Sequence, residues 1–253
     1  MKPHELASKD AEWHTFLNGK NIFDYFSEYP VLEHYNMDDE QDVDILCKDF
    51  NEYAGTKCSR EDFLFAARYW MKITSRPSFS FFRKPIYNTR PSYMLTISQV
   101  YDLIVEERHY KALTEEYRKL NAQGKANNFK STYFDYVTFS GTFSKRHSSA
   151  LIKHSGLMVI DIDHVTNVEK VKTTLLNDEK LRTELLFVSP GGNGIKWVIQ
   201  SYPEKYEHVF FFQGVSAYLK KRYAIETDQS GKDLARACFI CYDPNAYLNP
   251  QYL

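Results

Sequence analysis

Two aspartates, Asp161 and Asp163, close an apolar run that starts at Leu157. In a β-strand, residues i and i+2 point to the same face about 6–7 Å apart, so both carboxylates are expected together at the strand's end. Two carboxylates this close repel each other unless a cation lies between them. Because Mg²⁺ and Mn²⁺ prefer carboxylate oxygens, the pair indicates a divalent metal site. The alternative is a strand that simply ends in a polar loop.

A glycine-rich turn follows, with Ser189, Gly191, Gly192 and Gly194, and Lys196 comes directly after it. Glycines let backbone N–H groups approach a ligand without interference from a Cβ, and such turns can bind anions. Lys196 faces away from its apolar neighbours on the expected strand, so it would point into the site if they face the core. The spacing is not that of a P-loop, and no helix follows. A glycine-rich hairpin with a solvent-facing lysine is the alternative.

A third acid, Asp228, and a basic residue, Arg236, lie close together further on. Asp228 is a candidate third ligand for the same ion, and the guanidinium of Arg236 can fork onto phosphate oxygens. An ordinary loop with a helix cap at Asp233 is the alternative. Taken together, the three features are the parts of a nucleotidyl-transfer site. There, two divalent ions about 3.5–4 Å apart activate a 3′-hydroxyl and neutralise the leaving pyrophosphate, and positioning and charge stabilisation supply most of the catalysis.

The order of these motifs resembles the archaeo-eukaryotic primase superfamily, the primase-polymerases. More narrowly, it is similar to the N-terminal domain of virulence-associated protein E-like proteins from bacterial mobile elements, particularly of Bacteroides. The resemblance covers residues 76–253. Four segments carry it: Val137 to Phe143, Ser155 to His164, Ser189 to Lys196, and Asp228 to Asn249.

The resemblance implies an α+β fold whose primase-polymerase core has two layers and an RRM-like sheet. It implies that Asp161, Asp163 and Asp228 are catalytic and bind Mg²⁺ or Mn²⁺, in a suspected two-metal site. Lys196 stands where many members of the superfamily have histidine. The nucleotide would contact the glycine turn and lysine, together with two further residues: Ser189, Gly191, Gly192, Gly194, Lys196, Arg236 and Asn249.

The expected partners follow from the same resemblance. They are nucleoside triphosphates, a single-stranded DNA template and a replicative helicase acting in trans, because no P-loop helicase module occurs in the sequence. The activity expected is that of a DNA primase or primase-polymerase in the replication of a mobile element or plasmid.

Two other functions fit parts of the sequence. The first is a catalytically weak module of the same fold that binds single-stranded DNA for partner replication proteins, which the lysine at position 196 favours. The second is a haloacid dehalogenase-like phosphatase, because Asp161, Asp163 and Val165 fit its D-x-D-x-[TV] opening. Its later paired acidic motif is poorly matched by Asp228 and Asp233.

The elements that must position these residues can be read from hydrophobic spacing and turn residues. Ser59 and Asp62 form a capping-box pattern, followed by Phe63, Ala66, Ala67, Trp70 and Met71 at helical spacing. Helices are expected over 97–104, 113–120, 168–176 and 206–222. Strands are expected over 78–82, 133–143, 157–163, 185–189, 195–199 and 237–242.

Charge divides the chain near residue 76. Residues 1–75 hold 8 Lys/Arg against 15 Asp/Glu and are expected to form an acidic, mainly helical N-terminal extension. Residues 76–253 hold 24 against 18 and are expected to form the catalytic domain, with a basic portion from 76 to 160 that suits a polyanionic partner. With 43% hydrophobic residues, no long apolar stretch and no secretory leader, we expect a globular cytoplasmic protein that does not bind membranes.

Overall fold

The computed structural model describes residues 25, 39–55, 57–64, 66–67 and 77–252. The chain divides into two compact units, residues 1–76 and 77–253. They are called the N-terminal unit and the C-terminal unit below, and each is described by itself.

In the N-terminal unit, helix α3 (Glu40–Ala54) begins after Asp39, whose carboxylate accepts the backbone N–H of Gln41 at 2.9 Å, and ends at Gly55. A second helical run begins at Arg60. The predicted cap at Ser59 is confirmed, since its Oγ accepts the N–H of Asp62 at 3.1 Å. The positions of Trp70 and Met71 lie outside the described residues. The apolar faces of both helical runs form one core with the buried residues Tyr25, Val43, Leu46, Cys47, Phe50, Ala54, Phe63, Ala66 and Ala67.

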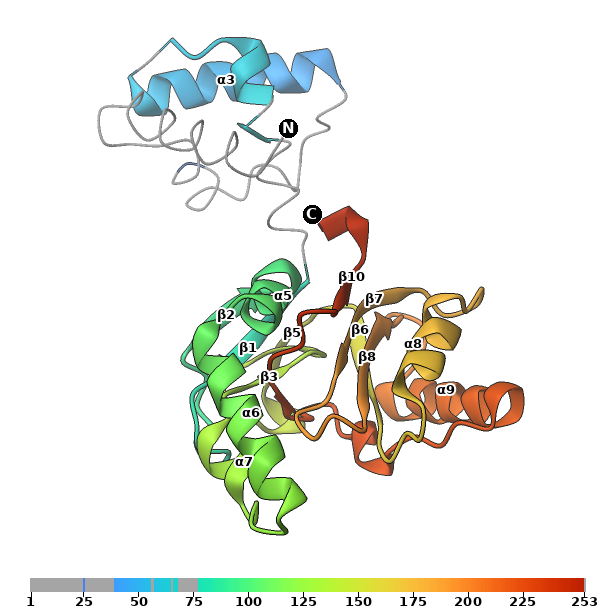
Figure 1. The fold of residues 1–253 in the computed structure, drawn as a ribbon. Helices are drawn as coiled ribbons and strands as arrows, with labels where there is room; N and C mark the ends of the chain where they lie inside the picture. The colour runs from blue at the N-terminus through green and yellow to red at the C-terminus, as the bar shows by residue number, and fades with distance from the viewer. Residues whose placement is uncertain (1–24, 26–38, 56, 65, 68–76, 253) are drawn as a thin grey trace. The chain divides into compact units, whose positions relative to one another are not determined.

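The C-terminal unit contains both helices and antiparallel sheets, which confirms the α+β class (Figure 1). Its first half consists of β1 (Ser78–Phe82), β2 (Tyr93–Thr96), α5 (Ile97–Val105), α6 (Arg108–Ala122), α7 (Phe129–Tyr133), β3 (Tyr136–Thr138), β4 (Gly141–Phe143), η2 (Ser148–Ala150) and β5 (Leu151–His154). Its second half consists of β6 (Leu157–Ile162), α8 (Val168–Leu176), β7 (Thr183–Val188), β8 (Ile195–Gln200), α9 (His208–Tyr223), η3 (Gln229–Lys232), β9 (Cys238–Phe239), β10 (Tyr247–Leu248) and η4 (Pro250–Tyr252).

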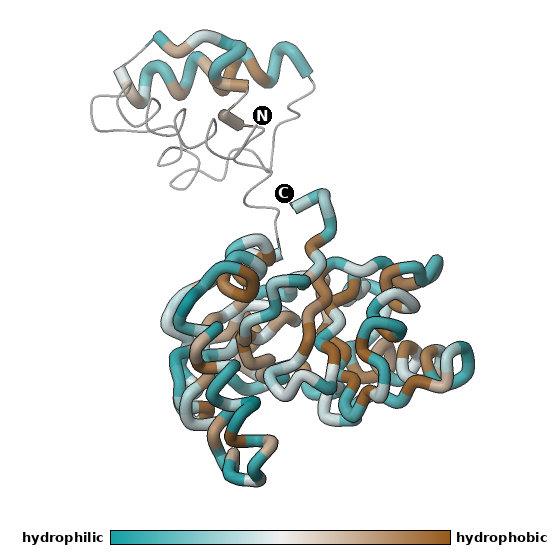
Figure 2. The backbone as a smooth tube through the Cα atoms, viewed as in Figure 1, coloured by the Kyte–Doolittle hydropathy of each residue, from teal (hydrophilic) through white to brown (hydrophobic). Residues whose placement is uncertain are grey.

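Two four-stranded sheets form the frame of this unit, with strand orders β2-β1-β3-β9 and β10-β7-β8-β6, and a β4-β5 hairpin adds a third, smaller sheet. Both faces of the second sheet are covered. Leu157, Val159 and Val198 pack into a core shared with α5, α6 and the first sheet. Met158, Ile160 and Trp197 pack into a core beneath α8 and α9. Hydrophobic residues therefore lie on both faces of the second sheet, and Figure 2 shows where they fall along the backbone.

Because side chains alternate along β6, Asp161 falls on the same face as Leu157 and Val159. That face is turned toward the core shared with the first sheet. The carboxylate of Asp161 therefore enters the unit between its two sheets, at the end of an otherwise apolar strand.

Three sequence expectations need correction. The strand expected over 133–143 is two short strands, β3 and β4, which belong to different sheets. The strand expected over 237–242 is only β9, which ends at Phe239. The second sheet has the β-α-β-β-α-β element order of an RRM-like sheet, but its last strand, β10, pairs with β7 instead of β6, so the strand order differs from the expected one. Among the described residues, no helix combines the length and apolar character needed to cross a membrane.

Candidate metal centre

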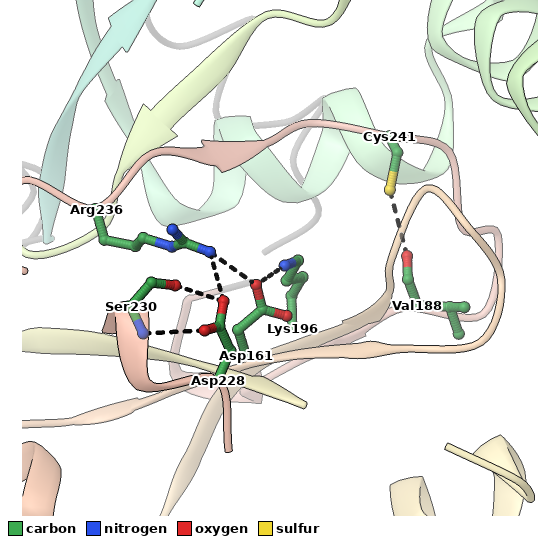
Figure 3. Close-up of polar contacts among 7 residues, drawn as sticks. All are labelled: Asp161, Val188, Lys196, Asp228, Ser230, Arg236 and Cys241. Atoms are coloured by element: carbon green, nitrogen blue, oxygen red, sulfur yellow. Dashed lines mark hydrogen bonds and ion pairs between the residues drawn. The ribbon is translucent and has the colours of Figure 1, made fainter. Parts of the chain in front are cut away.

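The register of β6 and β8 positions the first acid and the lysine. Asp161 lies directly opposite Lys196 in this antiparallel pair, and residues that face each other across two strands share one side of the sheet. Lys196 Nζ donates to Asp161 Oδ2, as Figure 3 shows. The expectation that Lys196 points into the site is therefore confirmed. It follows from Ile195 and Trp197, which are both fully buried in the opposite core.

Asp228 reaches the same place from the 3-10 helix η3. Its backbone N–H donates to the carbonyl of Asp161 at 2.8 Å. Its carboxylate caps η3 by accepting the N–H of Ser230 at 2.9 Å and the Ser230 hydroxyl. One end of Asp228 is thus held by the strand and the other by its own turn, which fixes the side chain beside Asp161 (Figure 3).

The three aspartates converge. One carboxylate oxygen from each of Asp161, Asp163 and Asp228 lies within 4.8 Å of the others. Asp161 is buried, Asp163 is exposed and Asp228 is intermediate, so the cluster opens to solvent on one side. Asp161 Oδ1 is buried and accepts no hydrogen bond within the described residues. A buried carboxylate oxygen without a partner is costly, and a cation held by the three carboxylates would satisfy it. The three residues could therefore hold a metal ion.

Two cations balance the carboxylates. Arg236 Nη2 lies 2.8 Å from Asp228 Oδ2 and 3.5 Å from Asp161 Oδ2. Burial alone would lower the pKa of Lys196, but the neighbouring carboxylates of Asp161 and Asp163 outweigh it and raise that pKa. Burial would raise the pKa of Asp228, and it is outweighed by hydrogen bonds from Ser230 and by the charges of Arg236 and Lys196, which lower that pKa. The lysine is therefore charged and Asp228 ionised at neutral pH.

The glycine turn joins β7 to β8 beside Asp163. It closes on itself, since the N–H of Ser189 donates to Gly194 O at 2.8 Å and the N–H of Gly192 donates to Ser189 O at 2.9 Å. Gly192 has φ +82°, a conformation that disfavours other residues. A Cβ on Gly194 would lie 2.9 Å from Ile162 O and 3.1 Å from Asp163 Oδ1. The absence of a side chain at Gly194 thus lets the turn pack against the end of β6 and Asp163, the residue that follows it.

The turn also supports the residues that follow Asp163. Asn193 O accepts the N–H of Val165 at 2.8 Å, which ties the residues after Asp163 to the turn. Gly191 lies in the same turn, half-buried. Of the residues expected to contact a nucleotide, Lys196 and Arg236 contact the carboxylates, and Gly194 packs against Asp163. Ser189, Gly191 and Gly192 belong to the same turn as Gly194.

Asn249 is the exception. Its side-chain amide donates to Thr183 O at 3.1 Å, and its backbone N–H donates to Glu184 O at 2.9 Å. Thr183 begins β7, whereas Phe187, near the other end of this strand, lies opposite Lys196. The pairing of β10 with β7 carries Asn249 to the far end of the sheet, so the structure does not bring it to the carboxylates.

Cys238 and Cys241, which form a C-x-x-C sequence, are free and buried. Burial raises the pKa of Cys238 to about 12. Cys241 Sγ donates to Val188 O at 3.3 Å (Figure 3). Both thiols are therefore protonated and serve packing next to the site.

A cavity of about 580 Å³ borders the carboxylate cluster. Its polar lining includes Asp163, His164, Glu226 and Asp228. Apolar side chains complete its wall: Ile162, Val165, Val171 and Ile225. A cavity of this size, lined by both carboxylates and apolar residues, suits a small organic ligand that carries a metal-bound group.

Sequence reasoning missed two supporting residues. Ser230 orients Asp228 through its hydroxyl and its N–H. Arg118, on α6, donates from Nε to Pro190 O at 3.1 Å and covers Gly192. The Asp-x-Ser spacing of a cap could have indicated Ser230. No local signal indicates Arg118, because it comes from a distant helix.

One known protein family is similar to the region of the chain that builds this site. A family model described as BT4734-like, N-terminal domain, matches residues 128–248. No curated protein and no solved structure gives a significant match. The matched residues contain Asp161, Asp163, Asp228, the whole glycine turn and Arg236, and they end one residue before Asn249. The part of this chain that is similar to the family is thus the part that builds the carboxylate cluster.

Proposed function

We propose that the C-terminal unit is a metal-dependent nucleotidyltransferase of the DNA primase-polymerase type. The observation that carries the proposal is the convergence of Asp161, Asp163 and Asp228, whose ligand atoms lie within 4.8 Å of one another. Mg²⁺ or Mn²⁺ at these carboxylates would activate a 3′-hydroxyl and neutralise the leaving pyrophosphate. The chain's own residues hold the ligand set in place, and the cavity that borders Asp163 and Asp228 offers room for the part of the incoming nucleotide beyond its triphosphate.

Arg236 and Lys196 have two roles in this proposal. Without a metal they neutralise Asp161 and Asp228. When a dication takes over that neutralisation, both cations become available for triphosphate oxygens, and the guanidinium of Arg236 suits bidentate binding of phosphate. We also propose that this unit has a primase-polymerase core and that the carboxylates bind two metal ions.

The test is primer synthesis by the full chain on a single-stranded DNA template, with labelled nucleoside triphosphates and Mn²⁺. We expect incorporation by the wild type and a loss to background in Asp161→Asn and Asp228→Asn. Asp102→Asn, an exposed aspartate on α5, is the matched control and should keep full activity. Incorporation that persists in both site variants would overturn the proposal.

A specific observation favours a second candidate, a catalytically weak module that binds single-stranded DNA. The ammonium of Lys196 already pairs with Asp161, so it competes with a metal for that carboxylate. Template binding without nucleotide incorporation in the same assay would select this function.

The phosphatase alternative receives less support. A dehalogenase-type site belongs to a doubly wound fold with a parallel sheet, whereas every strand pair among the described residues is antiparallel.

A further inference from the structure

Two stretches of the C-terminal unit contain no acidic residue. Residues 77–101 and 136–160 carry no Asp or Glu. Their basic residues are Arg83, Lys84, Arg90, Lys145, Arg146 and Lys153. The stretches are neighbours in space, because β1 pairs with β3 and is in contact with β4. One region of the unit therefore concentrates positive charge.

The centre of this region is a pair of loops, residues 83–92 and 144–147, called the basic loop pair here. The backbone N–H of Arg146 donates to Thr89 O at 2.8 Å, and its guanidinium donates to Ile86 O at 3.1 Å. The hydroxyl of Tyr136 donates to Asn88 O at 2.6 Å. The longer loop is thus fixed by side chains beneath it, which lowers the entropy that a ligand must remove on binding.

Aromatic side chains lie exposed among these charges. Tyr87, in the longer loop, is 81% exposed. Tyr93, on the edge strand β2, is 43% exposed, and its ring stacks on Phe81 with 4.5 Å between centroids. The guanidinium of Arg83 lies 5.8 Å from the centroid of Tyr93. Exposed tyrosines beside arginines form the kind of surface on which unpaired bases stack while phosphates meet cations.

We propose that the basic loop pair and the edge strand β2 bind single-stranded DNA. This inference rests on the proposed function, because it assigns a surface to the template strand. The buried carboxylate of Asp135 lies 3.3 Å from Arg83 and balances its charge. Lys84, Arg90 and Lys145 are exposed and face the phosphates. Unpaired bases offer their faces to Tyr87 and Tyr93, whereas a duplex or a lipid headgroup does not, so the surface selects single strands.

The test is fluorescence anisotropy of a labelled thymidine oligonucleotide with the full chain. We expect Tyr87→Ala to weaken binding about tenfold through the loss of one stacked base. The double variant Arg90→Ala/Lys145→Ala should reduce the slope of log affinity against log salt by about 1.4, because two phosphate contacts are lost on a single strand. All three side chains are exposed, so these variants should fold as the wild type does.

Matched controls come from the other half of the unit. Tyr206→Ala removes a tyrosine that is 55% exposed, and Lys205→Ala/Lys221→Ala removes two exposed lysines. Both controls should bind the oligonucleotide as the wild type does. Equal weakening by the controls, or binding of a duplex as tight as that of the single strand, would overturn the proposal.

The result of this DNA-binding test can be distinguished from the result of the test of nucleotide incorporation. Asp161→Asn should abolish incorporation and leave oligonucleotide binding unchanged, whereas Tyr87→Ala should leave Mn²⁺ binding unchanged. If the wild type binds Mn²⁺ at the aspartates but Tyr87→Ala does not weaken oligonucleotide binding, the proposed DNA-binding surface is refuted. The proposed function is not refuted by that result.

Discussion

Two aspartates of the C-terminal unit are almost equally buried, at 3% exposure for Asp135 and 4% for Asp161, yet their surroundings differ. Asp135, just before β3, accepts the N–H of Lys84 at 2.7 Å on one oxygen and the hydroxyl of Tyr110 at 2.8 Å on the other. Asp161 receives Lys196 and Arg236 on one oxygen, and its other oxygen has no partner in the described part of the chain.

The difference separates a structural carboxylate from a candidate ligand. A buried polar group that is fully hydrogen-bonded stabilises one arrangement of the chain, as Asp135 does by joining the loop after β1 to α6. A buried group that lacks a partner calls for an explanation such as an ion. Burial alone therefore does not identify a site. The site is identified by the Asp161 oxygen that has no hydrogen-bond partner in the described residues and by the two other carboxylates near it.

The largest effect on stability is expected from Asp135→Ala. The variant leaves the N–H of Lys84 and the buried hydroxyl of Tyr110 without an acceptor, which should lower the free energy of unfolding by about 4 kcal/mol. Urea denaturation measures this change, and Mn²⁺ binding by the folded variant should stay as in the wild type. A loss below about 1 kcal/mol would contradict the structural role.

Asp161→Asn is expected to change Mn²⁺ binding more than stability. It removes one carboxylate of the cluster while keeping its shape, so Mn²⁺ affinity should fall by about 100-fold, at the upper end of the losses that supporting residues alone produce. Isothermal titration calorimetry measures the affinity. If Asp161→Asn and Asp135→Asn changed Mn²⁺ affinity equally, the distinction between the two aspartates would fail.

Lys196→Met sharpens the comparison by removing the cation that occupies Asp161. A positive charge next to a binding site for a dication disfavours the ion, so its removal should tighten Mn²⁺ binding about tenfold. Nucleotide incorporation should nevertheless decrease, because the triphosphate loses a partner. Weaker Mn²⁺ binding in this variant would show that Lys196 organises the carboxylates and does not compete for them.

A smaller effect is expected at Asp178, outside the site, whose carboxylate accepts hydrogen bonds from uncharged groups. Burial would raise its pKa, but the hydroxyls of Tyr223 and Tyr218 and the N–H groups of Leu181 and Lys180 outweigh it and lower that pKa. A lowered pKa in the folded state stabilises the protein above the unfolded value of about 3.9, and this contribution is lost as the pH falls through the folded pKa.

The measurement is urea denaturation of wild type and Asp178→Asn between neutral and strongly acidic pH. The wild type should be the more stable protein at neutral pH, and the difference should shrink below about pH 4. A difference that does not vary with pH would assign the effect of the substitution to packing.

The part of the site that follows from local alternation was predictable. Ile195 and Trp197 belong to the core, so Lys196 had to face the other way, and the same period of two places Asp161 opposite the residues of the α8 and α9 core. The meeting of Asp228 with this pair was expected from the need of a metal site for a third acid and from the resemblance, since no local pattern joins η3 to β6.

The failures have long-range causes. Asn249 follows β10, and its position depends on which strand β10 joins, a choice made by tertiary packing. Most residues from Tyr133 to Phe143 favour strands, so the segment reads as one strand although Ser140-Gly141 is a turn signal. After the turn, β4 pairs with β5, and Gly141 allows their close approach because a Cβ there would lie 2.2 Å from Lys153 O.

The hydrogen bond from Asp228 N–H to Asp161 O has a consequence beyond the site. Strand β6 is the last in its sheet, so its outer side offers backbone groups to any extended chain that approaches. The segment that brings the third aspartate occupies one of those positions and blocks intermolecular strand addition there. A deletion that retracts this segment would thus create a protein prone to aggregation as well as one that lacks a ligand.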